Sequence, residues 1–218
     1  MTFDIRQKVF DRDGMPIEKK AMQYQDELVQ LFELSPEGQA LRNEGVEGDW
    51  FSMVIDFGIN YLSVTPPRMT PSGLREILFE IFPRKVSTTA DEAPNIIREL
   101  RGFWQFLQRE FQLENAAACL KILDDRAARQ LREELSNPAN FGIAKSFFML
   151  GLERGFDMTT EEGMNEWMAI YNAELATGAG PRIPLPGEQS ASARQFSANL
   201  QPRKARRDRK KHRNLKWN

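Results

Sequence analysis

Cysteine and histidine are nearly missing from this sequence, and their scarcity excludes several kinds of chemistry. Cys119 is the only cysteine and His212 the only histidine among 218 residues. A single cysteine forms no intramolecular disulfide, which favours a reducing compartment. Structural zinc sites combine several cysteine and histidine ligands, and nucleophilic triads need a histidine beside the nucleophile. We therefore predict no enzyme activity, no metal site and no cofactor, with Cys119 as a small core residue.

Long apolar runs and phosphate-binding glycine motifs are also absent. The first 14 residues carry charges throughout and lack the apolar segment of about 7–15 residues that marks a secretory signal. No stretch approaches the roughly 20 apolar residues that cross a bilayer. Neither G-x-x-x-x-G-K-[ST] nor G-x-G-x-x-G occurs. We expect a cytoplasmic protein without a transmembrane segment.

Helical periodicity is the strongest positive signal in the body of the chain. Between Asp91 and Phe111, apolar residues recur at intervals of three and four, the spacing that lines one face of a helix. Charged residues, Glu99 and Arg109 among them, are expected on the opposite face. No alternating run of β-branched residues predicts a strand. The fold class is therefore predicted to be all-α, an irregular bundle of about seven or eight helices.

Capping residues and prolines place the helix boundaries. Ser35, Thr70 and Asn137 each precede a proline, which suits the first position of a helix. Asp91 is a further candidate cap, and Thr159 with Glu162 matches a capping box. These signals predict helices at 18–34, 36–43, 49–63, 71–82, 91–111, 114–135, 138–154 and 160–175.

The composition changes sharply along the chain and divides it into four parts. We predict an N-terminal arm over 1–14 and a helical domain over 15–176. Residues 177–202 are rich in Gly, Pro, Ser, Ala and Gln, too poor in apolar side chains to offset the entropy of ordering, so they predict a disordered linker. Residues 203–218 form a basic tail.

The basic tail is the most informative segment for function. It carries nine Lys and Arg residues against Asp208, a local net charge of +8, whereas the whole chain sums to -1. Such residues neutralise a phosphate backbone and release its counterions, and an aromatic side chain stacks on an exposed base. The candidate nucleic-acid-binding residues are Arg203, Lys204, Arg206, Arg207, Arg209, Lys210, Lys211, Arg213, Lys216 and Trp217.

Other partners remain open for this tail. It is also suited to docking on the acidic body of its own chain, on another protein or on an anionic membrane. Adjacent carboxylates, as at Asp124 with Asp125 and Glu161 with Glu162, are expected on solvated helix faces, although a carboxylate site for Mg²⁺ or Ca²⁺ stays open. The many aromatic residues at helical spacing are expected in the core.

A proline-rich corner, Tyr61–Pro71, is followed by Phe82-Pro83-Arg84-Lys85-Val86 and later by Ala144-Lys145-Ser146. Over roughly residues 45–170 this combination resembles a family of uncharacterised bacterial all-helical proteins, a domain of unknown function. The resemblance implies a helical fold and no particular activity. From the residues themselves, Pro66 and Pro67 fix a corner, and Arg68, Arg84 and Lys85 are candidates for a small basic patch.

Two functional hypotheses follow from the separation of charge. In the first, a non-enzymatic helical binding protein contacts nucleic acid or a ribonucleoprotein through its basic tail, without strong sequence specificity. In the alternative, a protein–protein interaction adaptor offers its acidic body to a protein partner, and the tail docks on that body when the partner is absent. An enzyme built on paired carboxylates is a third class, and it requires a deep polar cleft.

Overall fold

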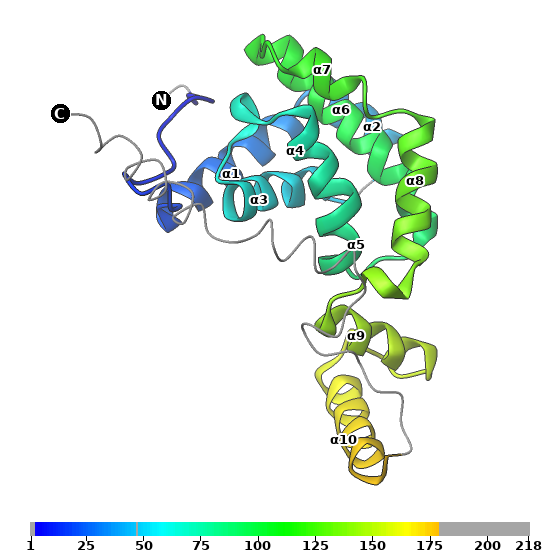
Figure 1. Cartoon of the computed structure of the whole chain (residues 1–218). Coiled ribbons are helices and arrows are strands. Elements are labelled where there is room, and N and C mark those ends of the chain that lie inside the picture. Colours follow the sequence, from blue (N-terminus) through cyan, green and yellow to red (C-terminus); the bar gives the residue numbers. More distant parts are fainter. Residues whose placement is uncertain (1–2, 47, 179–218) are drawn as a thin grey trace, which may run out of the picture. The chain divides into compact units, whose positions relative to one another are not determined.

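The computed structural model describes residues 3–46 and 48–178, and these ranges are folded into helices (Figure 1). They contain no β-strand, and Phe10 and Pro16 form an isolated β-bridge. The predicted all-α class is confirmed. The α-helices are α1 (Glu18–Glu33), α2 (Pro36–Asn43), α3 (Trp50–Leu62), α4 (Pro71–Glu76), α5 (Phe82–Lys85), α6 (Ala93–Phe111), α7 (Ala116–Leu120), α8 (Asp125–Ser136), α9 (Ile143–Glu153) and α10 (Glu161–Thr177).

Two of the predicted caps form as expected. The Ser35 hydroxyl accepts a hydrogen bond from the Gly38 amide at 3.1 Å, and Thr70 accepts one from the Gly73 amide at 3.0 Å. In each case a proline opens the helix, where its missing N–H leaves no intrahelical bond unmade. The starts of α2 and α4 were therefore predicted correctly from the sequence.

Two other predicted caps were wrong, and a third caps a shorter helix than the one predicted. The cap of α10 is Thr160, which accepts from the Gly163 amide at 3.1 Å, while Thr159 bonds back to Asp157. Asn137 caps a short 3-10 helix, η4 (Pro138–Asn140), rather than the long helix that follows. Asp91 lies inside another 3-10 helix, η3 (Ala90–Glu92), before α6 begins. A one-turn helix uses the same caps as a long one, so the sequence signal is identical.

The predicted helix over 114–135 is two helices, α7 and α8. Asp124 ends the connection between them because its side chain accepts a hydrogen bond from the Ala127 amide at 2.9 Å. An aspartate in this role holds an extended backbone conformation and starts a new helix. The break also leaves the Leu123 carbonyl free to accept a bond from Arg101 at 3.1 Å.

The helix that begins at Pro71 continues three residues beyond its predicted end. A π-helical segment, η2 (Ile77–Ile81), links α4 to α5, which contains Pro83. A proline inside a regular α-helix removes one backbone donor and clashes with the carbonyl four residues earlier. The wider π turn directly before Pro83 relieves this conflict, so the chain stays helical to Lys85.

The chain divides into two compact units, Met1–Phe141 and Gly142–Asn218. The predicted helical domain over 15–176 spans parts of both. In the first unit, the segment predicted to be an N-terminal arm supplies Ile5 and Val9 to the core, and the Tyr24 hydroxyl donates to the Ile5 carbonyl at 3.1 Å. The N-terminal residues from Phe3 onward therefore belong to the first folded unit.

Helix α6 is the central element of the first unit, with contacts to α2, α3, α7 and α8 (Figure 1). Phe103, Trp104 and Phe106 on α6 are buried, and Phe103 contacts Phe32 and Phe51 with ring centroids 5.3 and 5.4 Å apart. Cys119 is buried as well, and burial raises the pKa of its thiol to about 12. A thiol with so high a pKa is a packing residue rather than a nucleophile.

Candidate interaction surface

Every residue predicted to bind nucleic acid, from Arg203 to Trp217, lies outside the described residues, as does the predicted linker from residue 179 onward.

At the proline corner, Arg68 is exposed and Lys85 lies over the Tyr61 ring, 5.7 Å from its centroid. Asn115 fixes this corner by donating to the carbonyls of Pro66 and Met69 at 2.8 and 2.7 Å. The side-chain amide of Asn115 therefore holds the corner in place through hydrogen bonds to two backbone carbonyls.

Within the second unit, α9 and α10 are joined by a tight turn. Gly155 follows α9 with φ of +86°, and the Phe156 amide donates to the Gly151 carbonyl at 3.1 Å. This pairing satisfies carbonyls at the helix end and requires a residue that accepts a left-handed backbone. Helix α9 ends at Glu153, one residue before the end of the predicted helix over 138–154, and the next cap is Thr160 at the start of α10.

Trp167 is the centre of packing between α9 and α10. Its side chain is fully buried, and its indole Nε1 donates to the Phe147 carbonyl at 2.9 Å. The rings of Phe147, Phe156 and Tyr171 lie 5.4 to 5.7 Å from the indole, centroid to centroid. This cluster, with Met158, is the small core of the unit.

Close backbone approach makes glycine necessary at two positions of this unit. A Cβ atom on Gly151 would lie 2.8 Å from Cδ1 of Trp167, and one on Gly163 would lie 2.1 Å from the Asp157 carbonyl oxygen. Neither contact is tolerated without movement of the backbone or the indole. The orientation of α10 on α9 is thus set by Trp167 and Gly151, while Gly163 lets the start of α10 lie against the Asp157 carbonyl of the preceding turn.

That orientation leaves much of the apolar surface of α10 exposed. Its buried stripe is short and comprises Gly163, Trp167 and Tyr171. Eleven large apolar side chains are exposed in the described residues, and six of them lie in the second unit although it contributes only residues 142–178. These six are Ile143, Leu152, Met164, Met168, Ile170 and Leu175. Such a concentration of exposed apolar side chains is typical of an interaction surface.

The same surface is acidic. Residues 142–178 contain two basic and six acidic side chains, a net charge of -4, whereas residues 1–141 sum to -6 over nearly four times the length. Arg154 is already engaged, because it pairs with Glu174 and lies over the Trp167 ring at 5.4 Å. Three glutamates, Glu161, Glu162 and Glu166, are exposed in the first two turns of α10. Apolar side chains beside carboxylates suit a partner that is both apolar and basic.

Lys145 on α9 is a further titratable group that the helical pattern did not reveal. Its side chain is 2% exposed, and burial lowers the pKa of its amine to about 8. Lysine is scarce in protein interiors because its charge loses hydration there. Lys145 is buried because of its position on α9, and the spacing of charged residues in the sequence did not predict that burial.

Glu99 on α6 was predicted to face solvent and is instead buried, with 3% of its surface exposed. One carboxylate oxygen accepts from the Gly48 amide and the other from the Phe51 amide, both at 3.0 Å. Burial raises the pKa of this carboxyl, and the backbone donors oppose the shift. Glu99 therefore caps the start of α3 from another helix, which is a structural role.

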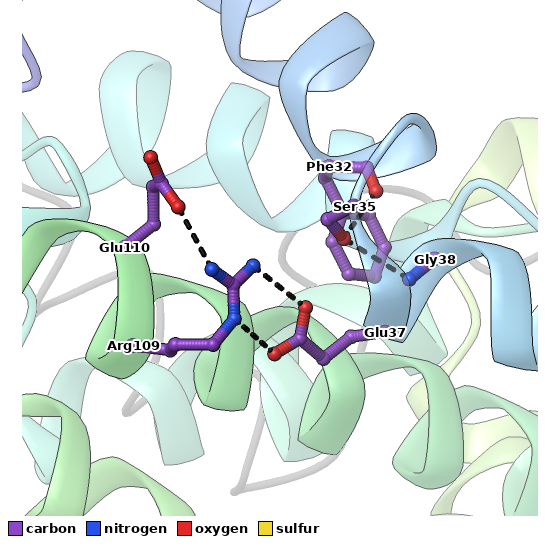
Figure 2. A network of polar contacts seen from close by, with 6 residues as sticks. All are labelled: Phe32, Ser35, Glu37, Gly38, Arg109 and Glu110. Carbon is purple, nitrogen blue, oxygen red and sulfur yellow. Dashed lines mark hydrogen bonds and ion pairs between the residues drawn. The ribbon is translucent and has the colours of Figure 1, made fainter.

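An ion pair joins α2 to α6 in the first unit. Arg109 binds both oxygens of Glu37, at 2.8 and 3.0 Å, and also contacts Glu110 at 2.8 Å (Figure 2). Figure 2 also shows Ser35, which donates to the Phe32 carbonyl while it caps α2. The Arg109 guanidinium lowers the pKa of Glu37. The network therefore ties the start of α2 to the last turn of α6.

A shallow groove of about 350 Å³ runs between α1 and α3. Asp56 in this groove accepts from Asn60 at 2.7 Å, and Gln25 donates to the Ser52 hydroxyl at 3.0 Å. Across residues 3–46 and 48–178, no group of three or more His, Cys, Asp or Glu side chains is placed to hold a metal ion. The residues that line the groove between α1 and α3 are Pro16, Glu18, Ala21, Met22, Gln25, Asp56, Ile59 and Asn60.

No helix of the described chain has the length and apolar character that a membrane span requires. No protein-family model, curated protein or solved structure matches this chain. The resemblance to an uncharacterised bacterial helical family stays a prediction.

Proposed function

We propose that this protein is a protein–protein interaction adaptor, and that the exposed surface of α9 and α10 binds a basic, partly apolar segment of a protein partner. The observation that carries the proposal is the concentration of exposed apolar side chains in residues 142–178. Burying Met164, Met168 and Leu175 against a partner would remove apolar area from water, the main favourable term in protein association. The lone cysteine supports a reducing, cytoplasmic setting for this function.

The charge of the surface defines the partner further. Glu161, Glu162 and Glu166 raise the local concentration of cationic segments and repel acidic ones. A partner helix or strand with alternating Lys or Arg and apolar residues would meet both features. Charge of this kind governs association rate and specificity more than final affinity.

The adaptor proposal is tested by capturing partners from cell lysate with matched variants. The test bait carries Met164→Ser with Met168→Ser, and the control bait carries Met15→Ser with Met22→Ser, because Met15 and Met22 are exposed at 63% and 61% in the first unit. Proteins retained by the parent and control baits, lost with the α10 bait and unaffected by nuclease support the adaptor. Identical captures with all three baits contradict it.

A second candidate function is binding of nucleic acid or a ribonucleoprotein through residues 203–218. The observation that favours it is the net charge of +8 in sixteen residues, against -9 for residues 1–202. If five to nine of the basic side chains engage phosphates, log K falls against log salt with a slope of about -5 to -8. Trp217 adds stacking on unpaired bases.

One truncation separates the two functions. A chain ending at Gln201 loses the basic tail, so a fluorescent RNA oligonucleotide should no longer bind if the tail is the nucleic-acid site. An adaptor whose tail competes for the same surface should instead bind its protein partner more tightly after truncation. RNA affinity that is unchanged by truncation contradicts the second function, and protein capture that disappears on truncation contradicts the first.

A further inference from the structure

The exposed part of α10 presents apolar and acidic side chains together. Met164, Met168 and Leu175 follow one another at intervals of four and seven residues, so they share one side of the helix. They are exposed at 38%, 47% and 42%. Glu161 opens the same side three residues before Met164. The α10 surface is defined as these four residues together with Glu162 and Glu166, which are also exposed but lie farther round the helix, about 120–160° from Met164 and Met168.

The C-terminal tail of the same chain has the complementary composition. Residues 203–218 carry nine basic side chains and one acidic side chain, and they end with two apolar residues, Leu215 and Trp217, among the cations. The basic side chains of such a segment pair with carboxylates, and its apolar side chains pack against exposed methionines. The described residues of the second unit sum to -4, so attraction favours this surface over a neutral one.

The length of the intervening chain permits the contact. Helix α10 ends at Thr177, and 24 residues, 179–202, precede the tail. A flexible segment of that length has a root-mean-square span of roughly 25–30 Å, and α10 itself is about 25 Å long. Every position on α10 is within reach, and tethering raises the effective concentration of the tail to the order of millimolar.

We propose that residues 203–218 dock on the α10 surface of their own chain, with Lys and Arg side chains against the glutamates and Leu215 and Trp217 against the methionines. The contact is reversible and salt-sensitive because most of it is exposed charge. It deepens the proposed adaptor function and rests on the same surface, which the tail would cover until a partner displaces it. A polyanion that binds the tail would likewise free the α10 surface.

The test attaches a nitroxide spin label to the full-length chain at Asn218→Cys and observes methionine methyl signals by NMR. Cys119 is buried, so the label enters at residue 218, and the parent chain treated identically is the control for this selectivity. We expect severalfold greater broadening at Met164 and Met168 than at Met22, and recovery of the signals at about 1 M salt, where the Debye length is roughly 3 Å. Met22 is a matched reference because it is 61% exposed on α1 beside Glu18, Asp26 and Glu27.

Charge reversal adds a second readout that does not depend on folding of the core. Glu162→Lys with Glu166→Lys should reduce the broadening at Met168, whereas Glu18→Lys with Glu27→Lys on α1 should leave it unchanged. Equal broadening at Met22 and Met168, or no broadening at either, overturns the proposal. A reversal on α1 that is as effective as the one on α10 also overturns it.

A mixed sample distinguishes the chain's own tail from that of a second copy. In this sample, one protein carries the spin label but no NMR-observable methyl groups, and the other carries observable methyl groups but no spin label. Broadening that appears when both labels are on one chain, and is absent from the mixture, supports docking within one chain. Equal broadening in the mixture overturns the proposal in favour of a second copy. Loss of partner capture with the Met164 and Met168 variant bears on the adaptor function alone, so the two proposals fail separately.

Discussion

The indole of Trp167 on α10 donates a hydrogen bond to the carbonyl of Phe147 on α9, twenty residues earlier in the chain. This bond and the ring contacts around it turn the large aromatic face of α10 inward. Because one side of a helix is fixed in this way, the methionines on the neighbouring side are left exposed. The packing of the small core and the exposure of the candidate surface therefore have one cause.

Replacing Gly151 with alanine should destabilise the α9–α10 pair. The new Cβ would meet the Trp167 ring 2.8 Å away, and overpacking of this kind costs about 1–3 kcal/mol. Hydrogen exchange of the α10 amides measures the effect, which should appear as faster exchange throughout α10. Leu152→Ala is the control, since Leu152 is 42% exposed and a surface change has little effect on stability. Equal protection in the two variants would show that Gly151 is not a packing position.

Replacing Glu99 with glutamine should destabilise the first unit. Glutamine keeps one acceptor oxygen but turns an NH₂ group toward a backbone N–H, so one of the two hydrogen bonds to Gly48 and Phe51 is lost. An unsatisfied buried donor costs about 1–3 kcal/mol. Urea unfolding monitored by circular dichroism measures the loss, with Glu114→Gln as the control because Glu114 is exposed.

The difference in stability between the parent protein and Glu99→Gln should also depend on pH. Burial raises the pKa of Glu99 in the folded state, so the folded chain holds this proton to higher pH than the unfolded chain does. The contribution of Glu99 to stability is therefore greatest below the ordinary glutamate pKa and declines as pH rises through the raised value. The stability difference between the parent and Glu99→Gln should shrink over that interval. A difference that grows with pH would contradict the raised pKa.

Local sequence signals predicted the helical fold because most of its information is local. Ser35 and Thr70 cap helices through residues three positions away, and the apolar spacing of α6 marks its buried face. Glu99 escaped prediction because its partners lie 51 and 48 residues earlier, and helical spacing alone places a glutamate with the solvent-facing charges. The exposed methionines of α10 escaped for a related reason, because only the packing of Trp167 decides which apolar side is covered.

The ion pair between Arg109 and Glu37 should contribute modestly to stability. Its geometry is bidentate, but the Arg109 side chain is 45% exposed, and water and salt screen exposed pairs. A double-mutant cycle with Arg109→Ala and Glu37→Ala should give a small favourable coupling energy that falls further at 1 M salt. Arg109→Lys should lose most of the coupling because lysine cannot bind both oxygens in a planar fork. A coupling energy that does not change at 1 M salt would contradict this picture of a solvent-screened pair.

Lys145 makes the second unit sensitive to alkaline pH. Burial lowers the pKa of its amine from 10.5 to about 8, so the folded chain releases this proton at lower pH than the unfolded chain does. Between these two values the unfolded chain binds more protons, and stability should rise with pH over that window. Lys145→Met keeps much of the side-chain volume without the amine, so the slope should disappear. Hydrogen exchange of the α9 and α10 amides, corrected for intrinsic exchange rates, measures this from pH 7 to 10. Lys121→Met is the control because Lys121 is exposed in the first unit. A slope that survives in Lys145→Met would assign the titration to another group and leave Lys145 without a part in the alkaline response.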